Sequence, residues 1–134
     1  MGHIITWDND EKTVVLQQYT EGASKDDLYM LAKKSNEMIT SVSHRVHLII
    51  DERMIDLVLN SADMKYLERL TPDNQGAVVM VVSKVKIPYK SLVQNFGKNV
   101  APNAFEEPYF AESIDAARQF LQDNFQVAYA ETSN

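Results

Sequence analysis

Two short apolar runs stand out from the mixed sequence around them. The first extends from Val46 to Ile50 and ends at Asp51, and the second extends from Ala77 to Val82. Neighbouring side chains on a strand point to opposite faces, so a strand that is apolar at successive positions is covered on both faces. Each run therefore predicts a buried strand in the middle of a sheet, with helices on either side.

The N-terminal part of the chain predicts a β-hairpin. Residues 3–7 and 13–19 are rich in the residue types that favour strands, and the residues from Asp8 to Glu11 between them are turn formers. Two strands joined by such a short polar connection pair antiparallel to each other.

Residues 24–42 have the spacing of an amphipathic helix. Ser24 is a suitable N-cap, and Asp26 and Asp27 fall in the first turn, where carboxylates meet the positive end of the helix dipole. Apolar and small residues then recur at intervals of three and four, which predicts one buried stripe. The stripe consists of Leu28, Leu31, Ala32, Ser35, Met38, Ile39 and Val42.

Three more helices and one more strand are expected further along the chain. A short helix capped by Asn60 or Ser61 extends to Leu70, and residues 52–60 before it have no firm assignment. A third helix begins at Ile87 and Pro88, because proline is tolerated in a first turn. Its predicted apolar face consists of Tyr89, Leu92, Val93, Phe96 and Val100.

Residues 105–110 predict a short strand, which Pro108 places at the edge of the sheet because proline cannot donate a hydrogen bond to a neighbouring strand. Ser113 then caps a last helix. Its predicted buried stripe consists of Ile114, Ala117, Phe120, Leu121 and Phe125.

The predicted order of elements is ββαβαβαβα. Alternating strands and helices form parallel strands joined by right-handed crossovers, and the opening hairpin adds one antiparallel pair. The expected fold class is therefore α/β, with a mixed, mostly parallel sheet. We expect one domain over residues 1–125, and a tail over residues 126–134 that frays.

Composition narrows the class of protein. A chain of 134 residues that is 45% hydrophobic and 24% charged can bury a core without a metal or a disulfide. The absence of cysteine excludes disulfides, thiolate metal sites and cysteine nucleophiles, and it suits a reducing compartment. A net charge of −6 argues against non-specific nucleic-acid binding. Residues 1–7 lack the features of a signal peptide, and no apolar run approaches the ~20 residues that span a bilayer, so we expect a soluble, cytoplasmic protein.

A family resemblance follows from the order of these elements. The opening hairpin, the capped helix from Ser24, the strand that ends at Asp51 and the strand from Val78 to Ser83 resemble a STAS-type domain. The segment 109–117, in which a short strand leads into a helix that begins with a capping residue and an acid, fits the same group. The chain is similar to the STAS-like relatives of bacterial anti-sigma-factor antagonists. That resemblance implies a regulatory α/β module that binds a partner protein.

One feature of the antagonists is missing from this sequence. In that family a serine or threonine follows the aspartate that ends the central strand, and its phosphorylation switches partner binding. Here Glu52 and Arg53 follow Asp51, and the nearest downstream hydroxyl is that of Ser61. A phosphate close to Asp51, Glu52 and Asp56 would also meet like charges. We therefore do not extend the phosphorylation switch to this chain.

The first candidate site lies where the two buried strands end. Open parallel sheets bind ligands beyond the carboxyl ends of their strands. Asp51, Glu52 and Arg53 follow one strand, and Ser83 and Lys84 follow the other. This edge is a candidate site for a polar ligand or a partner loop. The alternative is a set of solvated residues in surface ion pairs, worth roughly 0–1 kcal/mol each.

The second candidate site is a set of aromatic residues in the second half of the chain. If the third helix does not close fully on the sheet, these side chains line an apolar pocket or a dimer surface, and otherwise they belong to the core. The set consists of Tyr89, Phe96, Phe105, Tyr109 and Phe110.

The sequence provides little evidence for a metal site or a catalytic motif. His44 and His47 would point to opposite faces of one strand, so they could not share an ion. Asp8 to Asp10 begins like a calcium loop, but Thr13 stands where that loop needs glycine. The chain has no Gly-x-Ser-x-Gly elbow and no cluster of glycines that would bind phosphate. We expect no cofactor, no metal and no enzymatic activity.

Three hypotheses of function remain. The leading one is a non-catalytic, STAS-like protein-interaction or regulatory module that binds a partner protein or a second copy of itself. The alternative is a carrier of a small apolar or lipid-like ligand, held in a pocket under the third helix. The third is an enzyme that uses Asp51 and Arg53, for a reaction that the sequence does not specify.

Overall fold

The computed structural model describes residues 2–104 and 108–129, except the side chains of residues 93 and 94. The fold is α/β, as predicted, and its five-stranded sheet has the order β1-β2-β3-β4-β5. β1 pairs antiparallel with β2, and all the other neighbouring strands are parallel. The strands are β1 (His3–Trp7), β2 (Val14–Tyr19), β3 (Val46–Asp51), β4 (Gln75–Val81) and β5 (Tyr109–Ala111).

The two apolar runs form β3 and β4, which lie side by side and run in the same direction. Their register places Leu48 opposite Val78 and Ile49 opposite Val79. Ile49 and Val79 are fully buried. The predicted pair of central strands is therefore confirmed.

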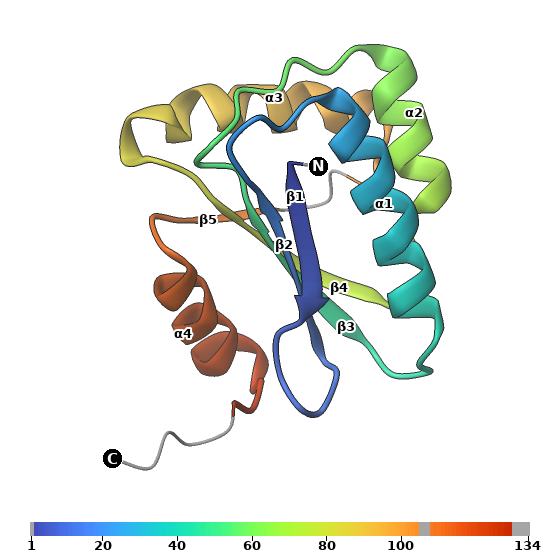
Figure 1. The fold of residues 1–134 in the computed structure, drawn as a ribbon, viewed down its shortest axis with the longest axis vertical. Coiled ribbons are helices and arrows are strands. Elements are labelled where there is room, and N and C mark those ends of the chain that lie inside the picture. Colours follow the sequence, from blue (N-terminus) through green and yellow to red (C-terminus); the bar gives the residue numbers. More distant parts are fainter. Residues whose placement is uncertain (1, 105–107, 130–134) are drawn as a thin grey trace.

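The helices cover the two faces of the sheet unequally. Because the strand order follows the chain order, right-handed crossovers place α1 (Lys25–Thr40), α2 (Ser61–Leu70) and α3 (Ile87–Val100) on one side. A 3-10 helix, Lys84–Lys86, leads into α3, and α4 (Ile114–Phe125) covers the other face. Figure 1 shows α1 and α2 along one face, α4 along the other, and α3 across the end where β3 and β4 finish.

Each face of the sheet has its own apolar core, because side chains alternate along the strands. On the α1 side, Val15 and Leu48 pack against Ile39. On the α4 side, Ile49 and Val79 pack against Leu121. The sheet is thus buried on both faces, as the two apolar runs predicted.

The predicted helix caps form as expected. The backbone N–H of Ser24 donates to the Asp27 carboxylate over 2.8 Å at the start of α1. At the start of α2, Asn60 Oδ1 accepts from the backbone N–H of Asp63 over 2.9 Å, which assigns the cap to Asn60 rather than Ser61. Both helices therefore begin where the sequence placed them.

The last predicted strand differs in extent. β5 begins at Tyr109, and it pairs with β4 at the edge of the sheet. Residues 105–107 of the predicted strand lie outside the described residues.

The C-terminal segment 126–129 packs against the fold, although the sequence placed it in a fraying tail. Val127 is buried with the core under α4, and Tyr129 Oη donates to Asp8 Oδ2 over 2.6 Å. Arg118 of α4 also binds Asp8, with 2.8 Å between Nη2 and Oδ1. These contacts hold the segment on the hairpin turn. Residues 130–134 lie outside the described residues.

A buried aspartate links α1 to α2. Asp63 is 2% exposed, and it accepts from Lys25 Nζ over 2.8 Å and from the Tyr29 hydroxyl, both of α1. Burial alone would raise the pKa of Asp63, but the hydrogen bonds from Lys25, Tyr29 and the Asn60 backbone outweigh burial and lower the pKa to about 2.

This shift predicts how stability depends on pH. The folded-state pKa of Asp63 lies below its ordinary value of 3.8, so its contribution is fully present above about pH 4 and is lost as the pH falls towards 2. We expect this loss to be on the order of 1–2 kcal/mol. Denaturant unfolding measures the free energy of unfolding. Between pH 6 and pH 2 this free energy should decrease less for Asp63→Asn than for the wild type.

The exposed Asp26 of α1 provides the control for that experiment. The Asp26→Asn variant should keep the wild-type decrease in stability. Parallel decreases for the wild type and Asp63→Asn would show that the link through Asp63 does not contribute as described.

Candidate functional site

The charged residues after β3 are bound to other parts of the same chain. Asp51 is 4% exposed, and Arg53 binds it with two parallel hydrogen bonds of 2.9 and 2.8 Å. Burial alone would raise the pKa of Asp51, but the hydrogen bonds from Arg53 outweigh burial and hold the pKa below its ordinary value. Asp51 is thus an ionised, internally paired carboxylate.

Glu52 forms a second ion pair, with Lys90 of α3. The distance between Lys90 Nζ and Glu52 Oε1 is 2.7 Å, and the two side chains are only 8% and 10% exposed. A buried charge needs such a partner, because leaving either side chain unpaired in a low-dielectric site costs several kcal/mol (order of magnitude). The pair therefore ties the inner side of α3 to the end of β3.

Ser83 and Lys84 lie exposed beyond the end of β4. The backbone N–H of Glu52 donates to the carbonyl oxygen of Val81, so the two strand ends do meet at one edge, as predicted. At that edge, however, Asp51 and Glu52 are already neutralised by cations of the same chain.

α3 turns Lys90 and Gly97 towards the protein and several large apolar side chains towards solvent. An α-helix turns by about 100° per residue, so Lys90 and Gly97 share one face, and both are buried. The opposite face carries four apolar side chains that continue from the 3-10 helix into α3. Their exposed fractions are 85% for Val85, 53% for Tyr89, 70% for Leu92 and 57% for Phe96. We call these four residues the α3 stripe.

This orientation corrects the prediction for the third helix. Tyr89, Leu92 and Phe96 of the predicted face point outward instead of packing on the sheet, whereas Val100 packs against Met64 and Ala101. The Val93 side chain lies outside the described residues. The cause is the position of α3, which crosses the end of the sheet and contacts α2. The sequence contains one indication of this orientation. Lys90, Gly97 and Ala101 recur on one face of the helix, and small residues such as Gly97 and Ala101 allow close packing.

A groove runs beside the α3 stripe. It has a volume of about 590 Å³, and its second wall is the extended segment between β3 and α2. Val58 of that segment is 72% exposed. The apolar lining consists of Leu57, Val58, Leu59, Met64, Tyr89, Leu92 and Phe96, and Asn95 and Asn99 complete the groove. The segment that forms this second wall belongs to residues 52–60, for which sequence analysis made no firm assignment.

The structure does not bring the predicted aromatic pocket together. Tyr89 and Phe96 lie on the outer side of α3, whereas Tyr109 packs against Phe120 of α4, with 4.6 Å between ring centroids. Phe110 follows Tyr109 on β5, opposite Met80 of β4. Phe105 lies outside the described residues. Tyr89 and Phe96 therefore lie in a different environment from Tyr109.

His44 and His47 are each held by a backbone group. His47 is buried, and its Nδ1 accepts from the backbone N–H of Ala77 over 2.9 Å, while the exposed His44 contacts the carbonyl oxygen of Lys12. Within the described ranges, no group of three or more His, Asp or Glu residues is arranged to hold a metal ion. No helix in the described part of the chain is long and apolar enough to cross a membrane.

Comparison with protein-family models, with curated proteins and with solved structures finds no match to this chain. The STAS-like resemblance therefore stays a prediction from the pattern and order of the elements.

The Glu52–Lys90 pair generates a prediction about stability. Lys90→Met leaves the Glu52 carboxylate without its partner, so we expect the free energy of unfolding to fall by about 3–5 kcal/mol. Adding Glu52→Leu removes the stranded charge, so the double variant should recover most of that loss. Denaturant unfolding of both variants measures the difference.

Lys98→Met provides the matched control, because Lys98 is exposed on the same helix. Its stability should stay within about 0.5 kcal/mol of the wild type. A double variant that is less stable than Lys90→Met alone would contradict the description of this pair.

Proposed function

We propose that this protein is a non-catalytic, STAS-like interaction module that binds a partner protein through the α3 stripe and the groove beside it. The observation that carries the proposal is the outward orientation of Tyr89, Leu92 and Phe96 on one helix. Single exposed apolar residues are ordinary on protein surfaces, but a contiguous set beside a groove is typical of an interaction site.

The arrangement of charges favours binding over catalysis. Catalytic acids and bases must be free to exchange protons with a substrate. Asp51 and Glu52, the carboxylates at the strand ends, are each committed to a cation within the fold. The groove beside α3 is lined by apolar residues and two asparagines. These features suit recognition of an apolar surface.

The lysines around α3 favour a partner that carries negative charge. Residues 83–104 contain four lysines and no acidic residue, in a chain whose net charge is −6. Lys86 pairs with Asp56 and Lys90 with Glu52, while Lys84 and Lys98 are exposed and form no ion pair with a described residue. Two exposed cations therefore flank an apolar stripe.

The partner that fits this surface is an amphipathic helix with apolar side chains spaced to enter the groove and carboxylates beside them. A second copy of this chain is a poorer fit, because two α3 surfaces in contact would bring exposed lysines together. We propose that the module acts in the cytoplasm, where its partner is a regulatory protein.

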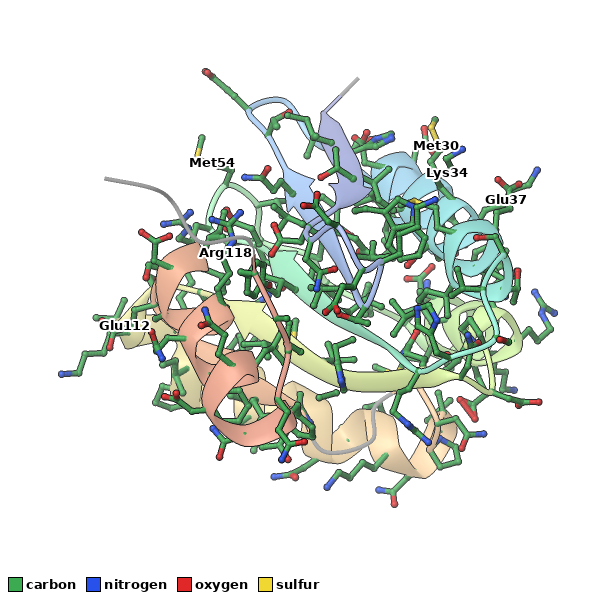
Figure 2. The ribbon with its side chains drawn as sticks, turned by 90° about the horizontal axis from the view of Figure 1, so that it is seen from below. Met30, Lys34, Glu37, Met54, Glu112 and Arg118 are labelled. Carbon is green, nitrogen blue, oxygen red and sulfur yellow. The ribbon has the colours of Figure 1, made fainter. Side chains whose placement is uncertain are left out.

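The test uses surface variants that should leave the fold intact. Leu92→Asp with Phe96→Asp places two carboxylates on the stripe, and Met30→Asp places one on α1. Figure 2 shows Met30 projecting from α1 away from the sheet, and its side chain is 40% exposed. All three substitutions alter exposed side chains, so thermal unfolding should change little.

Cross-linking and affinity purification from the native host should recover a specific protein with the wild type and with Met30→Asp, and lose it with the double variant. We expect the loss to be at least tenfold, because charged groups in an apolar groove are desolvated without compensation. Recovery of the same proteins with all three versions would overturn the proposal. A stable dimer that only the double variant abolishes would replace the partner helix with a second copy.

A further inference from the structure

A separate, partly open cavity lies on the α1 side of the sheet. It has a volume of about 130 Å³ and is bounded by α1, α2, β2, β3 and β4, and Lys90 and Glu52 also line it. Its apolar walls include Leu28, Leu48, Ile50, Leu67, Leu70 and Val78. An apolar cavity of about 150 Å³ is large enough to hold a benzene molecule. This cavity is therefore the size of one small ring.

One polar group in the wall lacks a partner. Ser35 of α1 is 5% exposed and lines the cavity, and its Oγ forms no hydrogen bond with any described residue. Helical serines commonly bond to the carbonyl oxygen four residues earlier, but Ser35 does not. A buried hydroxyl without a partner is unfavourable, so a ligand that pairs with it gains affinity.

The charged groups around the cavity favour an uncharged ligand. Glu52 and Lys90 neutralise each other across 2.7 Å, so neither is free to meet a charged ligand. Burial and the nearby Glu52 raise the pKa of Tyr19, whose side chain lines the same cavity, so its phenol stays protonated and neutral at physiological pH. A charged ligand would enter this site without a counter-charge.

We propose that this cavity binds a small uncharged molecule, with an apolar body about the size of one aromatic ring and a single hydroxyl or carbonyl oxygen that pairs with Ser35 Oγ. The proposal does not depend on partner binding at the α3 stripe. It also differs from the predicted pocket under the third helix, because the walls come mainly from α1, α2 and the sheet.

Phenol, benzene and benzoate are suitable probes for titrations of the full chain, followed by the NMR shifts of leucine and isoleucine methyl groups. Phenol should bind at least tenfold more tightly than benzene, because it alone supplies a partner for Ser35. Benzoate should not bind. Ser35→Ala should bring the phenol and benzene affinities close together, while Ser43→Ala, which removes an exposed hydroxyl, should keep the wild-type ratio.

Two more results decide the proposal. Ala32→Leu places a larger side chain in the cavity wall, and it should abolish binding of both rings while the protein stays folded. Absence of phenol binding at millimolar concentration would show that water alone occupies the cavity and would overturn the proposal. An unchanged preference for phenol in folded Ser35→Ala would overturn the role of the hydroxyl.

Discussion

One buried ion pair decides which way α3 faces. Lys90 reaches Glu52 at the end of β3 over 2.7 Å, and both side chains are almost fully buried. A lysine that is buried on one side of a helix directs the residues half a turn away to the opposite side. Tyr89, Leu92 and Phe96 therefore face solvent. The proposed partner surface follows from this internal contact.

The order of the strands explains why α3 has no other place to pack. With strands in the order of the chain, successive right-handed crossovers place three helices on one side of the sheet. α1 and α2 occupy the face itself, and α3 extends across the end of the strands (Figure 1). The second face is covered by α4 and by Val127 of the C-terminal segment. Tyr89, Leu92 and Phe96 of α3 are thus left exposed.

Local patterns in the sequence predicted the fold but only part of the candidate site. The burial of Ile49 and Val79 and the caps at Ser24 and Asn60 depend on nearby residues, so short patterns reveal them. The periodicity of α3 revealed an apolar face without revealing its direction, because direction depends on Glu52, far away in the sequence. Likewise, the packing of residues 126–129 depends on Asp8, which Arg118 and Tyr129 reach from the other end of the chain.

Thiol labelling tests the outward orientation of α3 most directly. The chain has no cysteine, so Leu92→Cys, Phe96→Cys and Leu31→Cys would each carry one thiol. If the stripe faces solvent, the first two variants react with a thiol reagent at rates close to those of the unfolded chain. Leu31→Cys, at a fully buried position, reacts only as fast as the protein opens. Protection of Leu92→Cys and Phe96→Cys as strong as that of Leu31→Cys would show that α3 packs inward, and would contradict this account.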